Sequence, residues 1–213
     1  MYDTVIFDLD GTLLDTLEDL CDSTNYALAK HGHPARTLEE VRRFVGNGVR
    51  RLIERALPDG VTGEEFDAVF EDFKAHYQIH CNDKTGPYDG ILPLLRELKS
   101  RGCKIGIASN KIKSAVQKLD GIYFEGLVDK AAGVEGSILP KPDSGMIKAL
   151  LRELGSDAAH TLYAGDSEVD VRTAANAGLD MVAVLWGFRG KEELQAAGAS
   201  RFIENPAQLT EYL

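Results

Sequence analysis

Three aspartates stand where apolar runs end, in a pattern that favours metal-assisted phosphate chemistry. Asp8 and Asp10 lie two residues apart at the end of the run 4–8, and Asp166 follows the run 161–164. Carboxylates gathered in one place repel one another unless a cation joins them, and hard oxygen ligands suit Mg²⁺. Each aspartate alone would be read as a helix cap or a turn former. Together, after separate predicted strands, they predict a magnesium site.

Groups that can hold a phosphate follow the other predicted strands. Ser109 and Asn110 come after the run 103–108 and can donate hydrogen bonds to phosphate oxygens, although Ser109 alone would serve equally well as a helix N-cap. Lys141 lies between two prolines, and an ammonium held there would offset phosphate charge. Without the other residues, an exposed lysine in a proline-rich turn is an equal alternative. Lys111 is a further candidate, for contact with the leaving group.

Asp170 is placed to support these groups. It follows Asp166 by four residues, so a helix that begins near Ser167 would direct both carboxylates to the same end. Asp170 could then orient Lys141 or a metal-bound water.

These residues require a sheet that brings separate strand ends together. Strand and helix patterns alternate after about residue 84, which predicts a parallel sheet with helices on both faces and ligand sites at the carboxyl ends of its strands. Residues 15–83 have helical patterns only, with a capping-box spacing from Thr37 to Glu40. We therefore predict an α/β, doubly wound core of residues 1–14 and 84–213 with an inserted all-helical cap domain, 15–83. The expected strands of the core are 4–8, 103–108, 127–131, 161–164, 181–185 and 201–203.

Charge and composition narrow the function classes. The 213 residues include 24 Lys and Arg against 34 Asp and Glu, a net charge of −10, which disfavours nucleic-acid binding. The net negative charge of the protein would also repel an anionic substrate, so a phosphate-binding site needs cations of its own nearby. No apolar run reaches the roughly 18 residues of a membrane span. The three cysteines are widely spaced and fit no disulfide framework, so we expect a reducing, cytoplasmic location. We also expect the protein to be a monomer or a homodimer.

Four segments in order carry a family resemblance. VIFDLDGTLLDT, IASNK, LPKPDS and AGDSEVDVRTAANAG resemble the four motifs of the haloacid dehalogenase superfamily, over nearly the full chain. The resemblance implies a Rossmann-like core with a small helical cap inserted after the first motif. It implies Asp8 as the nucleophile that attacks phosphorus and Asp10 as the general acid–base. Mg²⁺ would be held by Asp8, by the main-chain carbonyl of Asp10, and by Asp166.

The resemblance also assigns the supporting residues. Ser109 and Lys141 would hold the phosphoryl group. Apart from the resemblance, we expect Thr12 and Asn110 to contact the substrate, and Ser167 and Asp170 to support the metal and the lysine. The acid at Asp10 argues against carbon–halogen cleavage, because members with that activity lack it. The family often has Thr at the position of Ser109 and Asn or Asp at that of Val169, and neither departure removes a charged group.

The cap offers a hypothesis about the substrate. RRFVGNGVRRLIERAL resembles the cap of phosphoglycolate phosphatase-like members. Arg43, Gly46, Asn47 and Arg50 are its candidate substrate-binding residues, and a solvated helix face is an even alternative for both arginines. We expect a small phosphorylated metabolite, with 2-phosphoglycolate as the best guess.

Three other functions remain open on the sequence alone. A phosphomutase of the β-phosphoglucomutase type shares the aspartyl-phosphate step but returns the phosphate to a sugar. A pyrophosphatase is a closer variant. A noncatalytic phosphate-binding protein fits less well, because it has no need of a second acid, Asp10, beside the nucleophile.

Overall fold

The computed structural model describes residues 2–136 and 138–213. The chain divides into two compact units, one formed by the residues up to Asp15 together with Pro87–Leu213, the other by Thr16–Gly86. We call them the core unit and the helical unit. Within the described ranges, no helix is long and apolar enough to cross a membrane.

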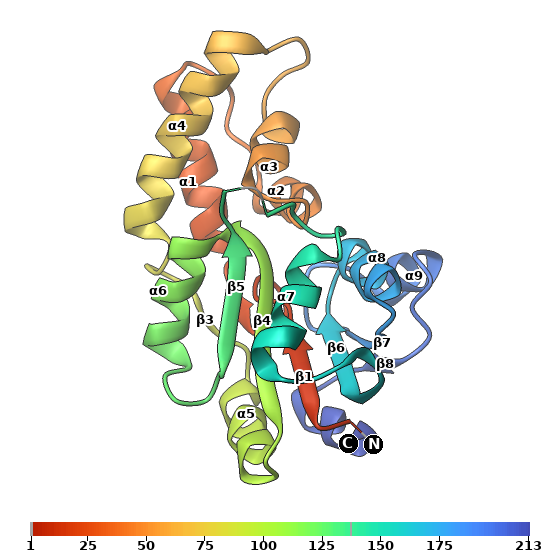
Figure 1. Cartoon of the computed structure of the whole chain (residues 1–213). Coiled ribbons are helices and arrows are strands. Elements are labelled where there is room, and N and C mark those ends of the chain that lie inside the picture. The colour runs from red at the N-terminus through yellow and green to blue at the C-terminus, as the bar shows by residue number, and fades with distance from the viewer. Residues whose placement is uncertain (1, 137) are drawn as a thin grey trace. The chain divides into compact units, whose positions relative to one another are not determined.

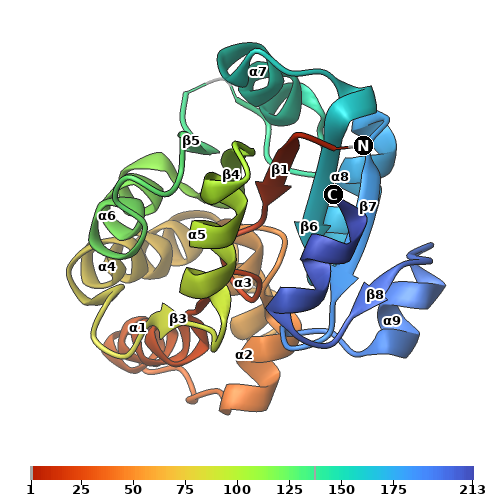
Figure 2. The same cartoon turned by 90° about the horizontal axis from the view of Figure 1, so that it is seen from below.

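The core unit is built on a six-stranded sheet in the order β5-β4-β1-β6-β7-β8, in which neighbouring strands are parallel (Figures 1 and 2). Strand β1 is central, because Thr4 pairs with Lys104 of β4 on one side and with Thr161 of β6 on the other. The predicted α/β class and doubly wound parallel sheet are therefore confirmed. The strands are β1 Thr4–Phe7, β4 Lys104–Ile112, β5 Lys130–Val134, β6 Thr161–Gly165, β7 Asp180–Val184 and β8 Phe202–Ile203.

Helices cover both faces of this sheet, and the alternation of side chains along β1 explains the two layers. Val5 and Phe7 are buried in a cluster with residues of α5 and α6, whereas Ile6 is buried with residues of α7 and α8. Each strand is thus apolar on both faces, as expected for a parallel sheet. The helices are α5 Ile91–Ser100, α6 Lys113–Tyr123, α7 Gly145–Leu154, α8 Glu168–Ala177 and α9 Lys191–Ala196, with 3-10 helices η1 Ala158–His160 and η2 Pro206–Tyr212.

The helical unit contains α1 Leu17–Lys30, α2 Leu38–Phe44, α3 Val49–Ala56 and α4 Gly63–His80. The two long helices, α1 and α4, pack against each other. Thr37 caps α2 with the predicted capping box, in which its hydroxyl accepts from the Glu40 N–H and the Glu40 carboxylate accepts from the Thr37 N–H.

The structure departs from the sequence-based expectation in several places, and one is strand β5, which was expected at 127–131 and lies at Lys130–Val134. Strand β4 was expected to end at residue 108 but continues to Ile112, because β5 pairs with it beyond a register shift between Ala108 and Ile112. Two short strands that were not predicted, β2 Leu14–Asp15 and β3 Gly86–Pro87, form a separate two-stranded sheet. The last predicted helix is the 3-10 helix η2.

A buried carboxylate ties together the two ends of the helical unit. Asp19, in the first turns of α1, is 2% exposed and accepts from the main-chain N–H groups of Lys84 (3.0 Å) and Thr85 (2.9 Å). The Thr85 hydroxyl donates to it as well, at 2.7 Å. Asp19 therefore satisfies two consecutive main-chain N–H groups where the chain leaves the helical unit.

We expect Asp19→Ala to destabilise the protein by about 2–4 kcal/mol, because it removes the acceptor of the hydrogen bonds from the Lys84 N–H and from the N–H and hydroxyl of the buried Thr85. Urea unfolding followed by circular dichroism measures the change. Asp22→Ala is the matched control on the same helix, because Asp22 makes only a half-exposed ion pair with Lys84. Equal unfolding midpoints for the two variants would contradict the assignment of Asp19.

Candidate active site

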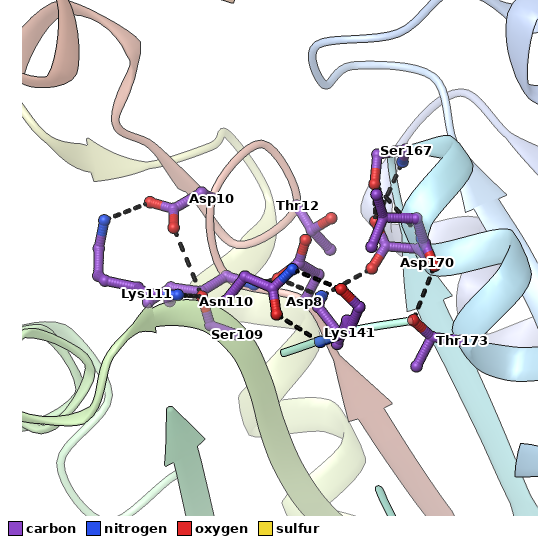
Figure 3. Close-up of polar contacts among 12 residues, drawn as sticks. Asp8, Asp10, Thr12, Ser109, Asn110, Lys111, Lys141, Ser167, Asp170 and Thr173 are labelled. Atoms are coloured by element: carbon purple, nitrogen blue, oxygen red, sulfur yellow. Dashed lines mark hydrogen bonds and ion pairs between the residues drawn. The ribbon is translucent and has the colours of Figure 1, made fainter. Parts of the chain in front are cut away.

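The site lies at the carboxyl ends of β1, β4 and β6 in the core unit (Figure 3). From β1 the chain goes to β4 and β5 on one side and then crosses back to β6 on the other, and doubly wound sheets bind ligands at such a switch point. Asp8 follows β1, Asp166 follows β6, and Ser109 lies in the bulged end of β4. The fold thus brings Asp8 together with two residues that are each more than one hundred positions away from it in the sequence.

Lys141 is the cation at the centre of the site. Its Nζ lies 2.8 Å from Asp8 Oδ1 and 2.7 Å from Asp170 Oδ1, and all three residues are buried. Asp8 Oδ1 also accepts from the Leu9 N–H at 2.7 Å. Two donors on the same oxygen fix the plane of the Asp8 carboxylate, and therefore the direction of its other oxygen.

Asp170 has two tasks, one for each carboxylate oxygen. Oδ2 accepts from the Ser167 N–H (3.1 Å) and hydroxyl (2.6 Å), which forms the capping box at the start of α8. Oδ1 accepts from Lys141 and from the Tyr163 hydroxyl at 2.8 Å. The helix cap therefore holds in place the carboxylate that holds the lysine.

The main chain of Lys141 is fixed by Asn110. The amide oxygen of Asn110 accepts from the Lys141 N–H at 2.6 Å, and its amide nitrogen donates to the Lys141 carbonyl at 3.0 Å. Asn110 was predicted to contact the substrate. In the structure its side-chain amide makes hydrogen bonds with both main-chain polar groups of Lys141.

Asp10 has its own partners on β4. Its Oδ1 lies 2.7 Å from Nζ of Lys111, a buried lysine, and its Oδ2 lies 3.5 Å from the Ser109 hydroxyl (Figure 3). The Lys111 N–H donates to the same hydroxyl at 3.1 Å. The bulged end of β4 therefore supplies both groups that contact the Asp10 carboxylate.

Asp166 is held by two loops. The Thr12 hydroxyl donates to its Oδ1 at 3.1 Å, and the Phe188 N–H donates to its Oδ2 at 2.7 Å. Thr12 was predicted to bind the substrate, and here its fully buried side chain contacts Asp166.

The electrostatics show a shortage of positive charge. Burial, followed by the charge of Asp170, raises the pKa of Asp8 well above its usual value, and Lys141 offsets this only in part. Burial and the Asp170 charge likewise raise the pKa of Asp166 to about 7. Burial would lower the pKa of Lys141, but Asp170 and Asp8 hold it well above normal. One ammonium thus stays charged among three carboxylates.

The donor set suits a hard divalent cation. Oxygen atoms of Asp8, Asp166 and Asp170 lie within 4.8 Å of one another. A cation beside Asp8 and Asp166 would supply the missing positive charge, and carboxylate oxygens are the ligands that Mg²⁺ prefers. Asp170 is the least suited of the three, because each of its oxygens already accepts two hydrogen bonds, Oδ1 from Lys141 and Tyr163 and Oδ2 from the N–H and hydroxyl of Ser167.

The other predicted site residues belong to the helical unit. Gly46 and Asn47 lie between α2 and α3. Arg43 lies 3.4 Å from Glu39, and the Arg50 guanidinium lies over the Phe66 ring at 4.5 Å. Both arginine side chains are exposed, and their role in substrate binding stays a prediction.

Sequence reasoning missed two features of the site. Tyr163 points into it from within β6, where a buried tyrosine looks like an ordinary core residue. The loop after β7 contributes the Phe188 N–H, and the rule of inspecting each strand end could have found it. The group that this loop contributes is a main-chain N–H, which residue type does not reveal.

The family match, the similar sequences and the similar solved structures all point to the same family. The family "Haloacid dehalogenase-like hydrolase" matches residues 5–184. Phosphoglycolate phosphatases of Caulobacter vibrioides and Cereibacter sphaeroides are 31% and 37% identical, over 95% and 87% of this chain and 86% of each relative. A solved structure from Lactobacillus delbrueckii subsp. bulgaricus, proposed to be a phosphoglycolate phosphatase, is 36% identical with a TM-score of 0.94, over 99% of this chain and 98% of that one. The chain therefore belongs to the haloacid dehalogenase-like hydrolases, as a phosphatase of the phosphoglycolate phosphatase-like type.

Proposed function

We propose that the protein is a Mg²⁺-dependent phosphate monoester hydrolase that works through a phosphorylated Asp8. The observation that carries this proposal is the buried group of Asp8, Asp166 and Asp170 around Lys141 at the switch point of the sheet. A simple structural role would not require three carboxylates with a single ammonium in one buried place.

Asp8 is the proposed nucleophile. One carboxylate oxygen attacks phosphorus while the bond from phosphorus to the leaving oxygen breaks, which gives an aspartyl phosphate and splits the hydrolysis into two easier displacements. The Lys141 ammonium and the Leu9 N–H hold Oδ1 and so leave the attack to the other oxygen. Lys141 and Ser109 would also offset charge on the phosphoryl oxygens.

Asp10 is the proposed general acid–base. It gives a proton to the departing alkoxide in the first displacement. In the second, its carboxylate takes a proton from the water that attacks phosphorus, which releases phosphate and restores Asp8. Its two partners, Lys111 and Ser109, approach from β4 and so fix the side of the site on which Asp10 acts.

Asp8, Asp166 and the main-chain carbonyl of Asp10 are the proposed Mg²⁺ ligands. When bound, the ion would neutralise charge on the phosphoryl group and on the carboxylates that face it. Because the pKa of Asp166 is about 7 before the ion binds, protons compete with the ion below that pH.

The proposed substrate is a small phosphorylated acid, with 2-phosphoglycolate first among the candidates. The support is the similarity to the phosphoglycolate phosphatases of Caulobacter vibrioides and Cereibacter sphaeroides. Arg43 and Arg50, with Gly46 and Asn47, are the proposed contacts to the substrate carboxylate.

Asp8→Asn should lower kcat by at least about a thousandfold, because an amide cannot form the phosphorylated intermediate. Phosphate release measures the loss, and the melting temperature shows whether the variant folds. Asp89→Asn removes the same charge from an exposed position and serves as the control. After acid quenching, the wild-type peptide with Asp8 should carry a phosphoryl group by mass spectrometry. Wild-type turnover by Asp8→Asn, or after complete removal of Mg²⁺ by a chelator, would refute the proposal.

Asp10→Asn should affect substrates according to their leaving groups. For alkyl phosphates we expect kcat/KM to fall by about 10²–10⁴, the usual contribution of a general acid. For p-nitrophenyl phosphate the loss should be much smaller, because that leaving group departs without a proton. The parameter kcat/KM is the right measure, because it reports the steps up to the first phosphoryl transfer. An equal loss on both substrates would exclude Asp10 as the acid.

A substrate panel tests the specificity. We expect kcat/KM for 2-phosphoglycolate to exceed that for neutral monoesters of similar size, and Arg43→Ala or Arg50→Ala to reduce this preference by raising KM. Pyrophosphate and sugar phosphates belong in the same panel. No preference for phosphoglycolate in the wild type would reject this substrate while leaving the phosphatase assignment intact.

A further inference from the structure

We propose that the loop Trp186–Arg189, between β7 and α9, is a positioning element that fixes the Asp166 carboxylate and thereby sets the affinity of the core unit for Mg²⁺. The inference rests on the proposed function in one respect, that Asp166 is a metal ligand. It assigns a role to residues that lie outside the four sequence motifs.

The first observation is that both oxygens of Asp166 are occupied by donors from opposite sides. The Phe188 N–H donates to Oδ2 and the Thr12 hydroxyl donates to Oδ1, and Asp166 is 1% exposed. A carboxylate held at both oxygens has one orientation before the ion arrives. Its remaining lone pairs are therefore directed in advance, which is how outer partners of metal ligands raise affinity.

The second observation is the closeness of the loop to Asp166 at Gly187. A Cβ added there would lie 2.4 Å from Asp166 Cβ and 2.4 Å from the Gly11 carbonyl oxygen. Both distances are far below van der Waals contact, and one of the two atoms belongs to the main chain. The loop can therefore reach Asp166 only because residue 187 has no side chain.

The third observation is that the same loop also holds the turn that carries Thr12. The indole Nε1 of Trp186 donates to the Thr12 carbonyl at 3.0 Å. Hydrogen bonds therefore link Trp186 to Thr12, Thr12 to Asp166, and Asp166 to Phe188, which lies in the same loop as Trp186. Movement of the loop would therefore disturb both hydrogen bonds to Asp166 together.

The loop is anchored at its far end by an ion pair. Arg189 is buried, and its Nε lies 3.2 Å from Glu168 Oε2, two residues beyond Asp166. The loop is thus tied to the segment 166–168 at two points, Phe188 and Arg189. Such a double attachment fixes orientation as well as distance.

Gly187→Ala is the decisive variant. We expect it to weaken binding of Mg²⁺ to the full chain by about 10–100-fold, the usual effect of losing the outer partner of a metal ligand. Isothermal titration with MgCl₂ alone measures this without any turnover. Gly190→Ala is the matched control, because Gly190 has φ −76° and the nearest atom to its added Cβ is 3.6 Å away. It should bind Mg²⁺ as the wild type does.

Trp186→Phe keeps the test decisive if Gly187→Ala fails to fold. It removes the hydrogen bond to Thr12 and keeps an aromatic ring in place of the indole that packs against the core, so the melting temperature should fall only slightly while Mg²⁺ affinity falls several-fold. Trp186 is also the only tryptophan in the chain, so its emission in the wild type should change with the same midpoint as the calorimetric titration.

The outcomes separate the two levels of the proposal. Wild-type Mg²⁺ affinity in a folded Gly187→Ala variant, or in Trp186→Phe, would overturn the role of the loop and leave the proposed function standing. No Mg²⁺ binding by the wild type, together with unchanged activity after chelation, would instead refute the proposed function.

Discussion

The site depends on a single buried ammonium shared by two carboxylates. Lys141 lies within 2.8 Å of both Asp8 and Asp170, and within the described part of the chain it is the only cationic side chain that forms an ion pair with Asp8. Since burying an unpaired charge is very unfavourable, removal of the lysine would leave two carboxylates uncompensated. Even with the lysine present the pKa of Asp8 is well above its usual value, so the surroundings of Asp8 are short of positive charge. The buried carboxylates are unfavourable without more positive charge than Lys141 supplies. A divalent cation would supply that charge, and the site is therefore suited to binding such a cation together with a phosphoryl group.

The rest of the core unit serves to hold these charges at fixed positions. The capping box of α8 fixes Asp170, and the bulged end of β4 carries Asn110, which fixes the main chain around Lys141. The same residues thus have both a structural and a chemical role. The question whether Asp170 is a helix cap or a site residue has no single answer, because each of its oxygens has a different task.

Much of this arrangement could be predicted from the sequence, for identifiable reasons. The runs before Asp8 and Asp166 are β-branched and apolar, so the strands and the residues that follow them were evident, and parallel topology required those ends to meet. The continuation of β4 to Ile112 could not be predicted, because a bulge depends on pairing with β5 and the segment Ser109–Lys111 is polar enough to resemble a loop. Tyr163 and Gly187 were missed for a related reason. What matters at these positions is a direction in space or the absence of a side chain, and neither has a signature in one sequence.

The central position of β1 has a consequence for synthesis of the chain. Thr4 pairs with Lys104 and Thr161, so the strand that carries the nucleophile leaves the ribosome long before either of its neighbours. The whole helical unit, Thr16–Gly86, is made in the interval and can fold first, since its contacts are closer along the chain. Meanwhile the apolar segment Thr4–Phe7 must wait unpaired. The chemistry of this enzyme is therefore assembled only after β4 and β6 have been made, around a strand that was made before both.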